Sequence, residues 1–324
     1  MADRLSQVIQ KPELQILINL LGSFDVSYPP YGLKLFSVRP AAGGYSVRVT
    51  ADRGDFRASH PDLPTFSDFY ECFISSGIVS YDNVYEFERQ LELYDSLKKG
   101  VAFAPDTNIL YHRFISNFRP MDGRQIVVAE GVKWEVENAM NYKYRNSQLL
   151  EIMSLVRNPG PLRELRNRRT KRSRKAAYIA LREFEKLKSR IIVAERYGTG
   201  HNNDEIIIKT LKHYDEMTPT LLVFLTADRA ITDVAEMEGL EYFLFQYPTS
   251  ELGEHGVSAY QLRTLIFNLA AIFGVVELGG TLVYGEFGGK AGLDELKLIF
   301  GDESLFKDFE FHLMLSRKLM GILR

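Results

Sequence analysis

Five short apolar runs divide the middle of the chain. Within each run nearly every position is apolar, and helical patterns of apolar and polar residues separate one run from the next. Strands of this kind are typical of a parallel sheet that helices cover on both faces. The pattern therefore predicts an α/β domain over residues 100–250, with strands at 101–105, 125–130, 190–195, 220–226 and 241–247.

The two flanking segments show different patterns. Residues 1–99 predict an α+β lobe, in which a helix at 5–21 precedes alternating apolar positions around an Ala-Ala-Gly-Gly turn and two amphipathic helices at 66–78 and 82–98. Residues 251–324 predict an apolar helix, a β-hairpin around Gly279-Gly280 and two closing amphipathic helices. Because the apolar helix has little polar surface, we expect this C-terminal extension to pack on the α/β core.

Composition adds constraints on the class of protein. The chain has 324 residues, of which 45% are hydrophobic, so it can bury the cores of two or more lobes. Its single cysteine, Cys72, excludes an intrachain disulfide and zinc sites built from cysteine pairs. The N-terminus lacks a signal-peptide pattern, and the longest apolar run, from Leu265, is shorter than the roughly 20 residues that a membrane span needs. We therefore expect a cytoplasmic protein without a membrane span.

The formal net charge is only −2, but one segment of the chain is strongly basic. Residues 157–190 contain thirteen Lys or Arg against three Glu, which predicts a long and mostly exposed basic helix over 161–190, either continuous or broken near 170–173. A solvated helix face would explain scattered charges. The nearly single sign favours contact with a nucleic acid instead. The expected contact residues are Arg166, Arg168, Arg169, Lys171, Arg172, Arg174 and Lys175.

Four acidic residues follow the predicted strands. Asp106 and Asp228 come directly after strands, Glu135 lies one helical turn beyond a strand, and Asp204 opens a helix. Taken singly, each can be a helix cap or a helix charge. Because parallel strands end at one edge of a sheet, however, the four carboxylates would converge there and repel one another. A divalent cation would offset this repulsion, and oxygen ligands without His or Cys favour Mg²⁺ or Mn²⁺.

The segments "PDTNIL", "VKWEVEN", "NNDEIII" and "LTADRAITDVAEMEGL" together resemble the four-acid signature of PIN-domain nucleases, over about residues 101–247. The resemblance implies a PIN-like parallel sheet and Mg²⁺- or Mn²⁺-dependent hydrolysis of phosphodiester bonds, most often in single-stranded RNA. Carried over by position, it implies catalytic and metal-binding roles for Asp106, Glu135, Asp204 and Asp228, a further metal-binding acid at Asp233, and supporting roles for Asn108 and Thr226.

Three functions stay open at this point. The complete set of acids favours an endoribonuclease over an inactive PIN scaffold that binds RNA or a protein, and over a structure-selective DNA nuclease. The chain has no cysteine pairs and no P-loop, which excludes the zinc-ribbon and ATPase-fused relatives. His201 is expected to be a loop residue rather than a metal ligand. The sequence does not decide whether the protein forms a homo-oligomer.

Overall fold

The computed structural model describes residues 5–56, 60–138, 143–165, 169–200 and 202–322. The chain forms two compact units, and each unit is assembled from segments that are distant in the sequence. The first unit comprises Met1–Cys72, Tyr142–Arg174 and Glu251–Arg324, and the second comprises Phe73–Asn141 and Lys175–Ser250. In the part of the chain that the structure describes, no helix combines the length and apolar character needed to cross a membrane.

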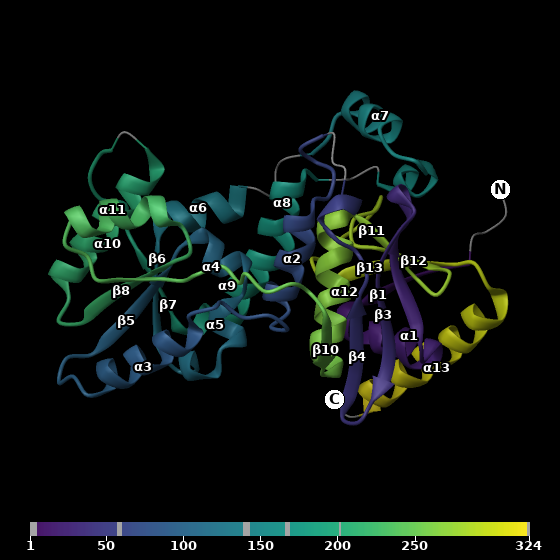
Figure 1. The fold of residues 1–324 in the computed structure, drawn as a ribbon, viewed down its shortest axis with the longest axis horizontal. Coiled ribbons are helices and arrows are strands. Elements are labelled where there is room, and N and C mark those ends of the chain that lie inside the picture. The colour runs from purple at the N-terminus through teal and green to yellow at the C-terminus, as the bar shows by residue number, and fades with distance from the viewer. Residues whose placement is uncertain (1–4, 57–59, 139–142, 166–168, 201, 323–324) are drawn as a thin grey trace. The chain divides into compact units, whose positions relative to one another are not determined.

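The second unit contains a five-stranded parallel sheet with the order β7-β6-β5-β8-β9. Figure 1 labels its strands β5, β6, β7 and β8. Consecutive residues of β6, including Ile126, Val127 and Val128, are fully buried. Because neighbouring residues of a strand point to opposite faces, both faces of the sheet are covered there. The predicted α/β fold with a parallel sheet is thus confirmed for this unit. The strands are β5 (Val101–Pro105), β6 (Gln125–Ala129), β7 (Ile191–Ala194), β8 (Leu221–Thr226) and β9 (Tyr242–Leu244).

The order of these strands determines where a ligand can bind. The chain proceeds from β5 through β6 to β7 on one side and then crosses back to β8 and β9 on the other. Ligands of open α/β sheets bind beyond the carboxyl ends of the strands at such a reversal. The helices of this unit are α3 (Val84–Asp95), α4 (Thr107–Tyr111), α5 (Phe114–Asn117), η4 (Arg119–Met121), α6 (Glu130–Asn138), η7 (Ala176–Ala180), α9 (Leu181–Leu187), η8 (Lys188–Arg190), α10 (Asn203–Met217) and α11 (Arg229–Met237).

The first unit is built on an eight-stranded antiparallel sheet with the order β1-β13-β12-β11-β2-β3-β4-β10. Strands from both ends of the chain are interleaved in this sheet, so residues 1–72 and 251–324 belong to one unit. The predicted separate lobe 1–99 and extension 251–324 are corrected accordingly, and residues 73–99 belong to the second unit. The strands are β1 (Ser6–Gln10), β2 (Phe24–Tyr28), β3 (Leu33–Ala41), β4 (Gly44–Val49), β10 (Glu254–Val257), β11 (Val275–Leu278), β12 (Thr281–Tyr284) and β13 (Glu295–Phe300).

Helix α12 forms the core of this unit, and its residues are buried over nearly its whole length. Ser258 caps its N-terminus, where the hydroxyl accepts a hydrogen bond from the Gln261 amide. Gly285, the residue after β12, lies so close to α12 that a Cβ atom there would be 2.3 Å from the carbonyl carbon of Ala270. The helices are η1 (Lys11–Glu13), α1 (Leu14–Leu21), η2 (Pro29–Tyr31), η3 (Arg53–Asp55), α7 (Asn146–Ser154), η6 (Gly160–Glu164), α12 (Ala259–Phe273) and α13 (Glu303–Ile322), with α2 (Phe66–Ser75) and α8 (Lys171–Lys175) crossing from one unit to the other.

The predicted helix over 161–190 is interrupted, and a new helical segment begins at Lys171, within the range 170–173 where a break was expected. In the described residues the predicted helix is replaced by η6, a non-helical stretch and a new helical start at α8, which continues through the π-helix η7 and α9. Thr170 explains the new start because its hydroxyl accepts a hydrogen bond from the Ser173 amide, as a capping residue does. Residues 166–168 lie outside the described part of the chain.

Candidate metal site

Asp106 lies directly after β5 and caps the N-terminus of α4. Its Oδ1 atom accepts a hydrogen bond from the Ile109 amide at 2.7 Å, and its Oδ2 atom accepts one from the Thr226 hydroxyl at 2.5 Å. Only 7% of the residue is exposed. Burial raises the pKa of Asp106 to about 6, and the negative charge of Asp228 raises it as well, against the opposing effect of the hydrogen bonds. Asp106 is therefore a helix cap that also interacts with a second carboxylate.

Thr226 connects these two aspartates at the end of β8. The residue is buried, and its hydroxyl oxygen accepts a hydrogen bond from the Asp228 amide at 3.0 Å while the hydroxyl donates to Asp106. Asp228 is exposed and caps α11 through a 2.9 Å bond from the Ala230 amide. The buried carboxylate of Asp106 and the exposed carboxylate of Asp228 thus lie beside the ends of adjacent strands β5 and β8.

Glu135 and Asp204 approach from two helices. Glu135 is half-buried on α6, and its Oε2 atom accepts a hydrogen bond from the Thr107 hydroxyl at 3.2 Å. Asp204 lies in the first turn of α10, where burial raises its pKa and the charges of Asp228 and Glu135 raise it further. The charge of Asp228 therefore acts on both Asp106 and Asp204, and the charge of Glu135 acts on Asp204.

The remaining predicted site residues, Asp233 and Asn108, have no described interaction with the four acids. Asp233 is exposed on α11 and is not among the groups that shift the pKa of Asp106 or Asp204. Asn108 is half-buried in the first turn of α4. The sequence interpretation missed Thr107, which holds Glu135; its hydroxyl next to the capping aspartate was the available signal.

The carboxylate oxygens at this edge are the type of donor that a hydrated divalent cation takes. Within the described ranges, no three His, Cys, Asp or Glu side chains are placed to enclose a metal ion. Mg²⁺, however, usually keeps several waters and binds through one or two carboxylates, so it does not require an enclosing cage. Among the described residues, no lysine or arginine is one of the groups that shift the pKa of Asp106 or Asp204.

The predicted nucleic-acid contacts are corrected at Arg174, which is 0% exposed. Its Nε and Nη2 atoms donate hydrogen bonds to the Ile272 carbonyl at 2.8 and 2.5 Å, and Nη1 donates to the Arg169 carbonyl. Ile272 lies in the last turn of α12, where carbonyl groups lack partners within the helix and a cation is favourable. Arg174 therefore stabilises the end of a buried helix rather than facing a phosphate backbone.

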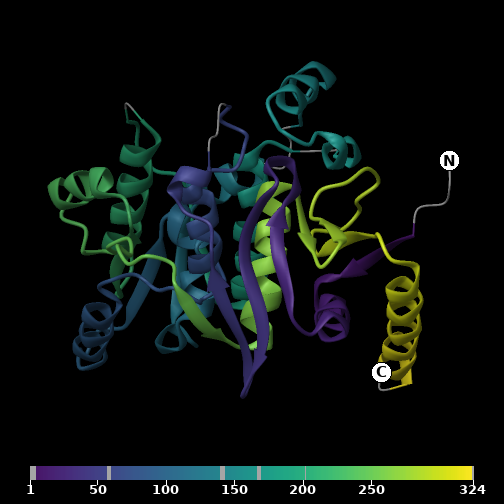
Figure 2. The ribbon, with the colours of Figure 1, turned by 45° about the vertical axis from the view of Figure 1, so that its right-hand side comes forward.

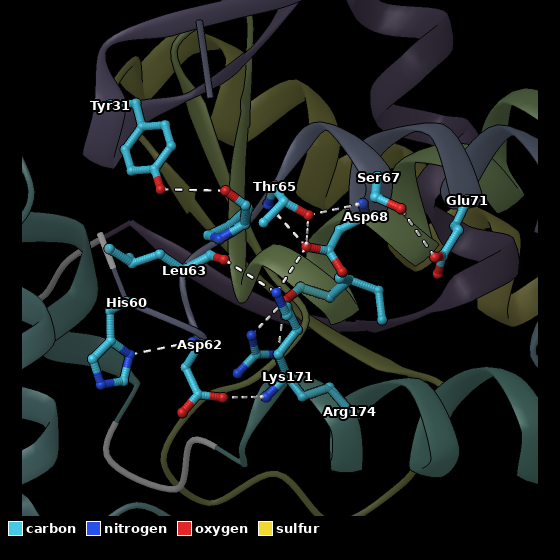
Figure 3. A network of polar contacts seen from close by, with 12 residues as sticks. Tyr31, His60, Asp62, Leu63, Thr65, Ser67, Asp68, Glu71, Lys171 and Arg174 are labelled. Carbon is cyan, nitrogen blue, oxygen red and sulfur yellow. Dashed lines mark hydrogen bonds and ion pairs between the residues drawn. The ribbon is translucent and has the colours of Figure 1, made fainter. Parts of the chain in front are cut away.

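Lys171 is similarly engaged within the first unit (Figure 3). Its ammonium group forms an ion pair with the buried Asp68 at 2.9 Å and donates to the Leu63 carbonyl, while its amide donates to Asp62. Arg169 and Lys175 are half-buried. Four predicted positions cannot be placed, because Arg166, Arg168, His201 and the side chain of Arg172 lie outside what the structure describes.

Comparison with known proteins adds no relative. No protein-family model matches the sequence, and a search of curated proteins finds no significant match. The resemblance to PIN-domain nucleases therefore rests on the acidic residues and their positions at the ends of the strands.

Proposed function

We propose that the protein is a metal-dependent endoribonuclease that hydrolyses phosphodiester bonds in single-stranded RNA, with a PIN-like catalytic domain in the second unit. One observation carries the proposal. Asp106, Asp204, Asp228 and Glu135 come from four separate segments. Burial raises the pKa of Asp106 and Asp204, the charge of Asp228 raises both further, and the charge of Glu135 raises that of Asp204. Grouped carboxylates destabilise a folded protein unless a cation compensates them, so their presence supports a metal site.

The side chains of the chain itself would orient the reaction. The Ile109 amide and the Thr226 hydroxyl fix both oxygen atoms of Asp106, so this buried carboxylate has a single orientation. Asp228 is exposed beside it and can reach a cation and an incoming phosphate from the solvent side. A bound Mg²⁺ or Mn²⁺ would lower the pKa of an attacking water and neutralise charge on the leaving oxygen. No covalent protein nucleophile is required.

Glu135 and Asp204 complete the acidic group in this proposal. The Thr107 hydroxyl orients Glu135, and Asp204, in the first turn of α10, is close enough to Asp228 and Glu135 for their charges to raise its pKa further beyond the effect of burial. Both can bind a cation directly or through its waters, since Mg²⁺ retains part of its hydration shell. Asp233 has no assigned part in this arrangement.

Substitution of Asp228 tests the proposal, and Asp233 on the same helix supplies a matched control. Wild-type protein should cleave a labelled single-stranded RNA with Mn²⁺ or Mg²⁺ and not with EDTA. Asp228→Asn retains a capping side chain for α11 but removes the charge, and it should lower the cleavage rate by at least about a hundredfold, because a bound cation contributes several kcal/mol to the transition state. Asp233→Asn should change the rate by less than about threefold.

The same assay distinguishes the alternatives. RNA binding without cleavage under every metal condition would favour an inactive scaffold. Equal cleavage of a matched single-stranded DNA would remove the preference for RNA, and preferred cleavage of a branched duplex would favour a structure-selective DNA nuclease. Equal loss of activity in Asp228→Asn and Asp233→Asn would contradict the assignment of the site.

A further inference from the structure

Helix α13 carries a stripe of exposed apolar side chains. Phe311, Met314, Leu315 and Leu319 are 58%, 50%, 44% and 52% exposed. At 3.6 residues per turn they fall on one side of the helix. Phe309 and Leu313 lie on the opposite side and are buried against the first unit. Figure 2 shows this helix, in yellow, running to the C-terminus along the outside of its unit. The stripe therefore faces outward.

Two charged residues continue the stripe at its ends. Asp308 and Lys318 are exposed, and neither forms an ion pair with a described residue. Together with Phe311 and Leu315 they occupy positions 308, 311, 315 and 318. These alternating spacings of three and four residues are those of the seam between two packed helices. An acidic end and a basic end thus flank an apolar centre on one helix face.

We propose that a second copy of this chain packs on the stripe, with the two α13 helices antiparallel. In this arrangement Phe311 faces Leu315 of the partner subunit, and Asp308 faces Lys318 of the partner subunit. Two-fold symmetry repeats each contact, so a single complementary pattern provides two ion pairs and a shared apolar centre. The proposal concerns the first unit and is independent of the nuclease proposal.

The charges argue against other occupants. A parallel pair would place Asp308 against Asp308 of the partner subunit and Lys318 against Lys318 of the partner subunit, which is unfavourable. A helix that lies on a membrane surface has a polar face rich in Lys and Arg. Here Asp308 lies in line with the apolar stripe, Glu310 adds further negative charge, and Glu303 forms an ion pair with Lys307. The pattern fits a self-complementary protein contact.

Sedimentation equilibrium of the full-length chain over a wide range of concentrations tests the proposal. Wild type should show a monomer–dimer equilibrium. Leu315→Arg and Asp308→Lys should each raise the dimer dissociation constant by at least tenfold, because each change acts twice in a symmetric dimer. The double variant Asp308→Lys with Lys318→Asp should restore the wild-type constant, since it exchanges the two charges only in the antiparallel register. Glu88→Lys, an exposed substitution on α3 with the same charge change, should have no effect. Circular dichroism and melting temperature verify the fold of each variant.

Four results would overturn the proposal. The first is a wild-type protein that is monomeric at every concentration. The second is a dimer that Leu315→Arg leaves intact, since another surface would then hold it. The third is a double variant that stays monomeric although each variant is folded, because the antiparallel pairing predicts its recovery. Cosedimentation of wild type with phosphatidylserine vesicles, lost in Leu315→Arg, would assign the stripe to a membrane surface and would also overturn it.

Discussion

Arg174→Ala should lower the free energy of unfolding of the first unit by about 3–5 kcal/mol. The guanidinium group is fully buried and donates hydrogen bonds to the carbonyl groups of Ile272 and Arg169. Its removal would leave two carbonyl groups without partners and create a cavity, and each unpaired buried polar group costs about 1–3 kcal/mol. Urea unfolding, combined with hydrogen exchange of the α12 amides, measures the loss.

Lys188→Ala is the control for this experiment, because Lys188 belongs to the same basic segment but is exposed. It should change the free energy of unfolding by less than about 0.5 kcal/mol. Arg174→Lys should fall between the two, since an ammonium group keeps the charge but cannot donate in the planar fork of a guanidinium. If Arg174→Ala unfolded like wild type and instead weakened RNA binding, the role in stabilising α12 would be wrong and the nucleic-acid interpretation would return.

Asp106→Asn should stabilise the metal-free protein above neutral pH, by up to about 3 kcal/mol. The folded protein raises the pKa of Asp106 from 3.8 to about 6 and so favours its protonated form. The stability from this group is complete below pH 4 and is lost as the pH rises through 6. Asparagine has no charge to bury, and its side-chain oxygen can still accept the hydrogen bond from the Ile109 amide. Its NH2 group cannot accept the hydrogen bond from the Thr226 hydroxyl, so about 3 kcal/mol is an upper bound.

Thermal unfolding in EDTA between about pH 4 and 8 tests this expectation. The two proteins should have similar stability at the acidic end, and the difference should grow as wild type loses its proton. Asp233→Asn, which removes an exposed carboxylate, should follow wild type at every pH. A large destabilisation of Asp106→Asn at pH 8 would mean that Asp106 acts mainly as a cap that needs a charged oxygen.

The strands of the second unit could be predicted because burial on both faces leaves continuous apolar runs. β5 and β6 begin at the residues where their runs begin, Val101 and Gln125. The strands of the first unit were harder to predict from the sequence. The segment predicted as a helix at 5–21 begins with strand β1, whose partner β13 lies almost 300 residues away in the sequence. Every second residue of β13 is buried, but this strand lies in a segment that the sequence pattern predicted to be helical.

For the acidic residues too, the local sequence pattern could be interpreted, whereas contacts between distant segments could not be predicted. Asp106 and Asp228 could be found because each combines a strand end with a helix start. The sequence also suggested Asp233, but this residue does not contribute to the pKa shifts of Asp106 and Asp204. Which residues of α11 face the other acids depends on the orientation of the helix, which the sequence does not give. Arg174 shows the limit most clearly. A run of basic residues predicts an exposed face, whereas the Ile272 carbonyl group to which this buried arginine donates is 98 residues away in the sequence.

Binding of Mn²⁺ tests the central claim most directly. A titration near pH 8, followed by electron paramagnetic resonance of the free ion, measures binding without any assumption about the substrate. The carboxylate site predicts that wild type binds Mn²⁺, that Asp106→Asn and Asp228→Asn each weaken binding at least tenfold, and that Asp233→Asn does not. Absence of binding to wild type, or equal binding by Asp106→Asn, would contradict a metal site at this edge of the sheet.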